Sequence, residues 1–276
     1  MQNGVWITAS DEIDTARMVE LGVLAEESGW DGVFVSDSLP FTEHPDPWIV
    51  LAGIAAQTET IRLGTWVVPL PRRQPWQVAQ EVGTLDRLSG GRIILGAGIG
   101  NSDDYDDYGM PYEPRERGER LDETLDIVTG LWTGEPFSYD GKYFQLDDAE
   151  VHPTPLQEPH VPILLGCWWP NKKPIHRGAR WDGIMPFFPS LIDAEAGPHG
   201  EEETGSPEEE VRDALAFYRD VADEPGEVVL PTVPSEDPTA FAETAAELGA
   251  TWQLATDLGG DLNAVAERIR EGPRKD

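Results

Sequence analysis

The sequence predicts an α/β fold, a (β/α)8 TIM barrel built from one domain of 276 residues. Eight short apolar runs alternate with eight segments of helical character along the chain. An open doubly wound sheet more often stops at about five or six strands, so this count favours a closed barrel. Glycines and polar residues follow several runs, as expected at the C-terminal face where such barrels carry their active sites.

The first four strands are predicted in the N-terminal part of the chain, at residues 5–9, 32–37, 61–69 and 92–101. Helices at residues 14–28, 46–57 and 76–88 separate them. Asp14 and Asp46 stand at the starts of the first two helices, where a carboxylate can accept the unpaired N–H groups of the first turn. The order strand, helix, strand is therefore uninterrupted up to residue 101.

The pattern changes after the fourth strand. An acidic run at residues 103–109 precedes a helix at 117–132, and Asp140-Gly141 lies between aromatic arms, which is a strong hairpin signal. We predict a helix-hairpin insertion over about residues 103–160 and a mobile acidic excursion over about residues 190–210. The remaining elements are strands at 161–167, 182–186, 227–230 and 251–255 and helices at 174–180, 207–222, 238–248 and 262–270.

The charge of the chain is strongly negative. Lys and Arg total 20 against 52 Asp and Glu, which gives a formal charge of −32, and only four of the basic residues are lysines. Such self-repulsion destabilises a compact state in dilute buffer, whereas molar salt shortens the Debye length to about 3 Å. We interpret the composition as halophilic, with an acidic protein of a mesophile as the alternative. The absence of a basic stripe argues against nucleic-acid partners.

The single cysteine, Cys167, excludes an internal disulfide and a cysteine-rich zinc site. No run approaches the roughly 20 apolar residues of a membrane span, and the N-terminal residues lack a basic segment followed by an apolar one. We therefore expect a cytoplasmic protein with no membrane partner.

Glycines alternate with other residues at the end of the fourth strand, at Gly96, Gly98 and Gly100. A dinucleotide-binding fingerprint would require another glycine and a helix start at position 101, but the chain has Asn101 there. A strand end without side chains lets a flat ring or a phosphate approach closely. Packing or turn formation explains such glycines equally well.

Two residues are candidates for acid–base chemistry. Asp37 ends the second strand and is placed to accept a hydrogen bond from a substrate or cofactor, although a loop cap is an equal alternative. His44 follows in the same connection and titrates near neutrality, but exposed loop histidines are common. The acidic run at 103–107 is interpreted as a solvated loop, and no metal site is predicted.

The fifth strand ends in Gly166, Cys167 and Trp168. Backbone amides of such a turn can hold a phosphate, and an indole can wall a ring, although tryptophans here are equally expected in the core. Cys167 has no adjacent histidine or local positive charge, so we expect a packed thiol rather than a nucleophile.

Taken together, the motifs resemble the bacterial luciferase-like (LLM class) family of flavin- or F420-dependent oxidoreductases, which are TIM barrels. The resemblance runs from residues 29–37 (GWDGVFVSD) to 177–183 (RGARWDG). Its most specific parts are residues 63–65 (LGT), 69–76 (PLPRRQPW) and 84–92 (TLDRLSGGR).

The resemblance implies a cofactor ring near Asp37, Thr65 and Gly98, beside a non-proline cis peptide on the third strand. It implies a cofactor phosphate near Asn101 and the turn formed by Gly166, Cys167 and Trp168. It also implies a homodimer. The expected cofactor is coenzyme F420 or FMN, with F420 slightly favoured by the halophilic composition.

The expected function is therefore an oxidoreductase that transfers hydride between bound F420 or FMN and a small organic substrate. An FMN-dependent monooxygenase is the alternative within the family. A non-catalytic flavin-binding or storage protein is the alternative of another class, and a metal-dependent barrel hydrolase is disfavoured.

Overall fold

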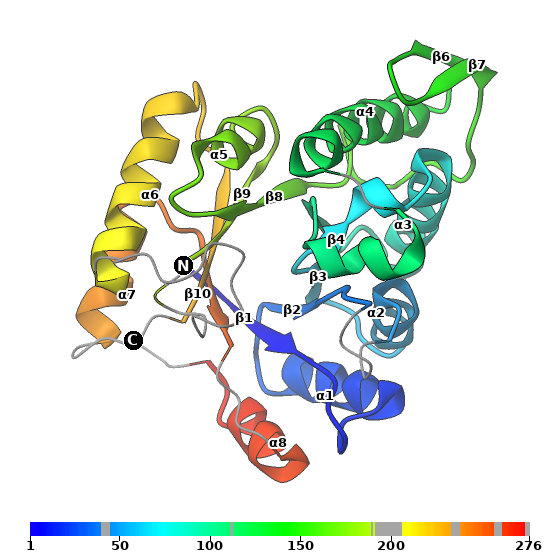
Figure 1. Cartoon of the computed structure of the whole chain (residues 1–276). Coiled ribbons are helices and arrows are strands. Elements are labelled where there is room, and N and C mark those ends of the chain that lie inside the picture. The colour runs from blue at the N-terminus through cyan, green and yellow to red at the C-terminus, as the bar shows by residue number, and fades with distance from the viewer. Residues whose placement is uncertain are drawn as a thin grey trace.

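Nine parallel strand segments close into one barrel in the computed structural model (Figure 1). The structure describes residues 1–39, 45–110, 113–188, 190, 206–232, 238–256 and 261–273. Barrel closure is shown by β1, which pairs with both β2 and β11. The segments are β1 (Gln2–Ile7), β2 (Gly32–Val35), β3 (Arg62–Thr65), β4 (Val68–Pro69), β5 (Ile93–Gly98), β8 (Ile163–Trp168), β9 (Gly183–Phe187), β10 (Glu227–Pro231) and β11 (Trp252–Ala255).

The third barrel strand is made of two pieces. Both β3 and β4 pair with β5, and Trp66 and Val67 interrupt the strand between them. Counting this interrupted strand once gives the eight-stranded barrel that the sequence predicts, and the (β/α)8 fold class is confirmed.

Helices cover the outside of the barrel between successive strands (Figure 1). The Asp14 carboxylate accepts the N–H of Arg17, and the Asp46 carboxylate accepts the N–H groups of Trp48 and Ile49, so both predicted helix caps are confirmed. The helices are α1 (Thr15–Glu27), α2 (Pro47–Ala55), α3 (Pro75–Ser89), α4 (Pro114–Trp132), α5 (Lys172–Gly178), α6 (Pro207–Val221), α7 (Pro238–Glu247) and α8 (Leu262–Arg270), with 3-10 turns η1 (Leu70–Arg72), η2 (Ser102–Asp104) and η3 (Asp106–Tyr108).

The predicted hairpin is present as the antiparallel pair β6 (Phe137–Asp140) and β7 (Gln145–Ala149), which lies beyond α4 in Figure 1. Its connection is longer than the two-residue turn that Asp140-Gly141 suggests. The Glu123 carboxylate on α4 accepts the N–H groups of Lys142, Tyr143 and Phe144, at 2.8, 3.0 and 3.1 Å. These bonds hold the connection against α4 and keep Tyr143 and Phe144 out of the strand.

Two apolar layers follow from the alternation of side chains along each strand. Val5, Val33 and Val35 belong to the layer between strands and helices, whereas Phe34 belongs to the barrel interior. The interior cluster consists of Phe34, Trp66, Ile94, Leu164, Met185, Val229, Trp252 and Leu254. Side chains thus fill the barrel, and ligand chemistry is left to its ends.

Most of the acidic excursion expected over residues 190–210 lies outside the described residues. Within it, Pro207 to Glu210 form the first turn of α6, and the buried Glu210 carboxylate accepts the N–H and hydroxyl of Ser190. No helix in the described part of the chain combines the length and apolar character that a bilayer span requires.

Candidate functional site

Four aromatic side chains from different strands meet at the C-terminal end of the barrel interior. The centroid of the Trp66 ring lies 5.3 Å from that of Trp6 and 4.9 Å from that of Phe187, and the Phe187 centroid lies 6.4 Å from that of Trp168. Trp6, Trp168 and Phe187 are partly exposed, while Trp66 is 8% exposed. We refer to Trp6, Trp66, Trp168 and Phe187 as the aromatic layer. Trp66 belongs to the interior cluster, and Trp6 and Phe187 pack against that cluster at the end where the strands finish.

Hydrogen bonds fix two members of the aromatic layer. The indole N–H of Trp6 donates to the Ser36 hydroxyl at 2.8 Å, and that hydroxyl donates to the carbonyl oxygen of Trp66 at 2.9 Å. The buried indole nitrogen of Trp66 has no hydrogen-bond partner among the described residues. The layer therefore offers flat apolar faces and, at Trp66, an N–H donor without a partner among the described residues.

The strand interruption explains the glycines of β5 and β8. An added Cβ at Gly96 would lie 1.9 Å from the Thr65 carbonyl oxygen, and one at Gly98 would lie 2.8 Å from the nearest Val67 methyl. A Cβ at Gly166 would also meet Val67, at 3.1 Å. These glycines thus make room for the chain's own interrupted strand.

Thr65 is fully buried in the barrel wall. Its hydroxyl donates to the Gly96 carbonyl at 2.8 Å and accepts the Gly96 N–H at 2.9 Å. The Trp66–Val67 peptide that follows is cis, as the family resemblance implied for this strand. Thr65 and Gly98 therefore support the interrupted strand directly, and their contact with a cofactor stays a prediction.

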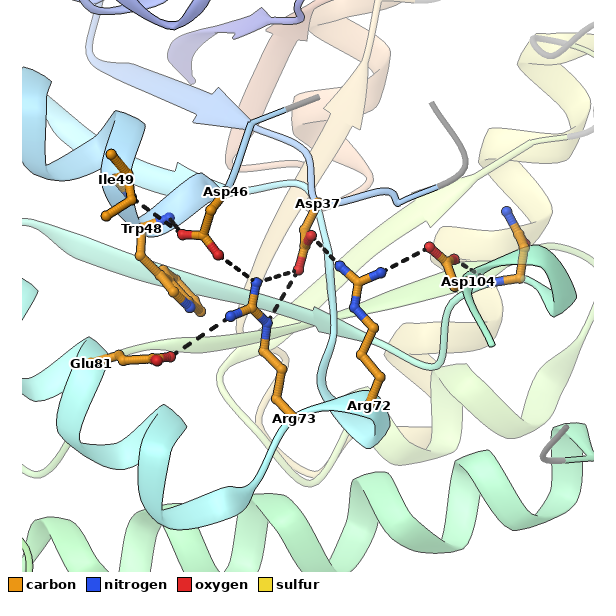
Figure 2. A network of polar contacts seen from close by, with 9 residues as sticks. Asp37, Asp46, Trp48, Ile49, Arg72, Arg73, Glu81 and Asp104 are labelled. Carbon is orange, nitrogen blue, oxygen red and sulfur yellow. Dashed lines mark hydrogen bonds and ion pairs between the residues drawn. The ribbon is translucent and has the colours of Figure 1, made fainter. Parts of the chain in front are cut away.

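Asp37 is the centre of a buried ion-pair network (Figure 2). Its Oδ1 accepts from Arg72, and its Oδ2 accepts from the Nη2 of Arg73 at 2.9 Å. The Asp37 and Arg72 side chains are each 5% exposed. Because guanidinium groups hold both carboxylate oxygens, Asp37 is placed to order loops rather than to exchange protons; a catalytic role for it stays a prediction.

The network joins three connections at the C-terminal face (Figure 2). Arg72 also bonds the Asp104 carboxylate at 3.1 Å, and Arg73 also bonds the Asp46 carboxylate at 2.9 Å. The second arginine further lies 3.8 Å from Glu81 on α3. Both arginines lie in the motif at residues 69–76, but nothing in the sequence indicated that carboxylates of the same chain pair with them.

The acidic run after β5 is solvated only in part. Asp103, Asp106 and Asp107 are exposed, but Asp104 is 3% exposed, so the prediction of a wholly solvated loop was wrong at this residue. Burial raises the pKa of Asp104. Two contacts oppose that rise: the backbone N–H of Asn101 donates to the carboxylate at 2.9 Å, and the positive charge of Arg72 lies beside it. Asn101 was predicted to lie near the cofactor phosphate, and its backbone N–H is already bonded to Asp104 within the chain.

The end of β8 is also largely paired. Gly166, Cys167 and Trp168 are aligned with β9, the Trp169 N–H donates to the Phe187 carbonyl at 2.9 Å, and the Asn171 N–H donates to the Trp168 carbonyl at 2.9 Å. The Cys167 thiol is fully buried, and burial raises its pKa, which confirms the packed thiol.

Exposed lysines follow immediately after this strand end. Lys172 and Lys173 begin α5 and account for half of the chain's four lysines. Lysine is a point charge suited to phosphate. His44, the other predicted catalytic residue, lies outside the described residues. No group of three or more metal-ligating side chains comes together among those that are described.

A family model described as luciferase-like monooxygenase matches residues 1–229 of the chain. The chain belongs to this family. The predicted family is thereby confirmed, and the match extends from β1 into β10.

Curated relatives of this luciferase-like chain include enzymes named for F420. The chain is 36% identical over 171 residues to the F420-dependent glucose-6-phosphate dehydrogenase of Microbacterium testaceum, an alignment that covers 59% of this chain and 50% of the relative. The corresponding protein of Nakamurella multipartita is 34% identical over 171 residues, with 59% and 49% covered. The chain thus spans about half the length of the curated relatives it matches.

Solved structures share the luciferase-like fold over nearly the whole chain. The monooxygenase RslO1 from Streptomyces bottropensis gives a TM-score of 0.79 at 20% identity and covers 98% of this chain and 97% of its own. The coenzyme F420-dependent tetrahydromethanopterin reductase from Methanopyrus kandleri gives 0.76 at 16% identity, with 98% of each chain covered. At these identities the likeness concerns the fold.

Proposed function

We propose that the protein is an oxidoreductase that transfers hydride between bound coenzyme F420 and a small organic substrate. The observation that carries the proposal is the 36% identity to an F420-dependent dehydrogenase over 59% of the chain. FMN is the alternative cofactor, because the family model is that of a monooxygenase. With FMN, monooxygenation would be the competing activity.

The residues of the aromatic layer fit a flat tricyclic ring. Trp66, Trp168 and Phe187 supply apolar faces at the end of the barrel where ligands bind, and Val67 lies beside them. The unsatisfied Trp66 N–H suits a ring edge that carries carbonyl oxygens or ring nitrogens. When bound, F420 supplies the hydride chemistry, and the protein supplies binding and orientation.

The phosphate of either cofactor is assigned to Lys172 and Lys173. The backbone of Gly166 to Trp168, which the resemblance implied, runs beside β9, and the next N–H groups are already bonded. The two lysine side chains are exposed directly after that strand. In a chain of charge −32, two adjacent cations at this face are the natural counter-charge for an anionic cofactor.

The proton of the reaction is assigned to His44. A hydroxyl group that is oxidised to a carbonyl releases a proton, and a neutral imidazole nitrogen can accept it near neutral pH. Asp37 is assigned a positioning role, because Arg72 and Arg73 hold both of its oxygens. Through Arg72 it fixes Asp104 and hence the connection that follows β5.

The test is titration of the purified protein with F420 and with FMN in molar KCl, followed by quenching of tryptophan fluorescence. We expect saturable binding of F420 and its reduction by a donor substrate. Saturable binding with no reduction by any donor would indicate a storage protein, and FMN binding with oxygen consumption would indicate the monooxygenase. Failure to bind either cofactor would refute the proposal.

A pair of variants tests the phosphate assignment. The double substitution Lys172→Ala and Lys173→Ala should weaken cofactor binding at least about tenfold, because it removes the two cations that we assign to the cofactor phosphate. Lys142→Ala is the matched control, since Lys142 lies on the hairpin connection and pairs with Glu119. Equal Kd values for the two variants would exclude the assignment.

A further inference from the structure

The Lys172 side chain rests on an aromatic ring of the neighbouring helix. Its Nζ lies 4.9 Å from the centroid of the Phe217 ring. Phe217 belongs to α6, which packs against α5 (Figure 1). A lysine ammonium over the face of an aromatic ring is attracted by the negative charge density of that face. The long side chain of Lys172 therefore has a defined resting place, although the residue is exposed.

The Phe217 ring is itself held by the segment that follows β8. The His176 ring, which comes later on α5, lies edge-on to it with the ring centroids 5.3 Å apart and an interplanar angle of 86°. The centroid of the Trp169 ring lies 6.4 Å away. Phe217 and Trp169 are partly buried and pack against the apolar core. The ring that receives Lys172 is thus fixed by its own packing.

The backbone around Lys172 is fixed as well. The Asn171 N–H donates to the Trp168 carbonyl at 2.9 Å, and the Asn171 side chain accepts the Lys173 N–H at 3.3 Å. Trp168 belongs to the aromatic layer, so this turn places Lys172 beside the end of the barrel to which we assign the cofactor ring. The Lys173 side chain, in contrast, has no hydrogen bond, ion pair or ring contact with any described residue.

A comparison with Lys142 shows that the charge of Lys172 is left available. Lys142 lies over the Tyr143 ring at 4.7 Å, but it also bonds the Glu119 carboxylate at 2.8 Å. No carboxylate oxygen of a described residue lies within 4.0 Å of the Nζ of Lys172 or Lys173, although the chain has 52 Asp and Glu. An aromatic face orients a cation without neutralising it or occupying its N–H donors. Lys172 is therefore an oriented cation that can still bind an anion.

We infer that Phe217 is a positioning residue for the cofactor phosphate, which it serves by holding Lys172 in place, and that Lys172 provides more of the phosphate binding than Lys173 does. The inference rests on the proposed function and divides the phosphate assignment between the two lysines. An ordered lysine gives up little conformational freedom when a phosphate binds, whereas Lys173 must be ordered at that moment. The argument applies to F420 and FMN alike, because both carry a phosphate.

The experiment measures how much the anionic part of the cofactor contributes to binding. F420 is compared with its deazaflavin riboside, which lacks the phosphate and the chain attached to it, by tryptophan quenching at one KCl concentration. The Kd of the riboside divided by the Kd of F420 reports the anionic part alone, because both ligands share the ring contacts. If FMN is the cofactor, riboflavin and FMN give the same ratio.

Single lysine variants test the division between the two cations. Lys172→Ala should lower the ratio of Kd values at least about fivefold, because it removes the oriented charge. Lys173→Ala should lower it less than about twofold, because the charge it removes is not held in place. Both residues are exposed, so neither change disturbs the core.

Variants of Phe217 test the positioning role. Phe217→Leu should lower the ratio about threefold, because leucine fills the space but has no aromatic face for Lys172. Phe217→Tyr keeps the face and should keep the wild-type ratio. In the Lys172→Ala protein, Phe217→Leu should change the ratio no further, since the ring acts through that lysine. Phe241→Leu is the matched control, because Phe241 on α7 is also partly buried and packs against the core.

Three outcomes would overturn the inference. One is a wild-type ratio near unity, and another is an effect of Lys173→Ala as large as that of Lys172→Ala. The third is an equal loss of affinity for F420 and for the riboside in Phe217→Leu, which would show that the ring only supports the fold. The lysine comparison decides even if Phe217→Leu does not fold. Failure of the wild-type protein to bind any of the four ligands would instead refute the proposed function.

Discussion

The Thr65 hydroxyl and the Gly96 backbone form a reciprocal pair of hydrogen bonds, with the hydroxyl donating to the carbonyl at 2.8 Å and accepting the N–H at 2.9 Å. The pair stands where β3 ends and the regular ladder to β5 is interrupted. The Thr65 side chain therefore satisfies the carbonyl and the N–H of Gly96, which the interrupted strand does not pair through its main chain. Trp66 follows directly after this pair.

Replacing Thr65 by valine should test this relationship. Valine keeps the shape but leaves a buried carbonyl and a buried N–H without partners, at about 1–3 kcal/mol each. We expect the free energy of unfolding to fall by about 2–4 kcal/mol in urea denaturation at constant KCl. Thr133→Val, at an exposed residue whose hydroxyl bonds Gly130, is the control and should change stability by less than about 0.5 kcal/mol. Similar losses in both variants would argue against the pair.

Arg72 should contribute far more to stability than an exposed arginine does. Arg72→Gln leaves Asp37 and Asp104 buried without their shared cation, and we expect a loss of about 3–5 kcal/mol. Arg17, whose partner Glu20 is 62% exposed, provides the comparison, and Arg17→Gln should cost less than about 1 kcal/mol. Chemical denaturation of both variants in the same buffer measures the two losses in the free energy of unfolding. If Arg72→Gln does not fold, Asp104→Asn, which keeps Arg72 paired with Asp37, should remain folded.

Glu26 should make the stability of the fold depend on pH. Its carboxylate loses hydration, which raises its pKa, but the N–H groups of Thr60, Ile61 and Glu59 together lower the pKa below its ordinary value. Because the folded pKa is depressed, the stabilisation is present above the ordinary glutamate pKa and is lost as pH falls through the folded value. Glu26→Gln should cost about 1 kcal/mol at pH 7, since water competes at this partly exposed group.

The measurement is urea unfolding of wild type and Glu26→Gln from about pH 7 to about pH 3. The difference in unfolding free energy should shrink as pH falls below about 4.5, where the wild-type carboxylate becomes protonated. If the difference in unfolding free energy between wild type and Glu26→Gln stays constant over this range, the charge of the Glu26 carboxylate does not contribute to its binding of the three N–H groups.

The barrel could be predicted because its evidence is local. About ten neighbouring residues are enough to indicate each strand or helix, each of the caps Asp14 and Asp46, and the hairpin after α4. The predicted ends of strands and helices were less exact where contacts with distant residues determine them. Glu123, for example, draws Lys142 to Phe144 onto α4 and lengthens the hairpin connection.

The site was predicted less well because its partners lie far apart in the sequence. Arg72 meets Asp37 across 35 residues and Asp104 across 32, so neither pairing leaves a local pattern. The aromatic layer draws Trp6, Trp66 and Phe187 from three distant strands, and each alone resembles a core residue. Trp6 and Phe187 lie at the C-terminal ends of β1 and β9, whereas Trp66 lies in the interruption between β3 and β4.

The charge of −32 leads to a final prediction, that the protein requires salt to stay folded. Raising KCl from about 0.1 to about 1 M shortens the Debye length from about 10 to about 3 Å, so repulsion among surface carboxylates fades. We expect the thermal unfolding midpoint to rise over this range, as followed by circular dichroism. Sucrose, which strengthens burial without screening charge, should not reproduce the rise at low ionic strength in full.

Replacing exposed Asp106 and Asp107 by lysine changes the charge from −32 to −28 and should lower the KCl concentration required for folding. A midpoint independent of KCl in both proteins would refute the halophilic interpretation.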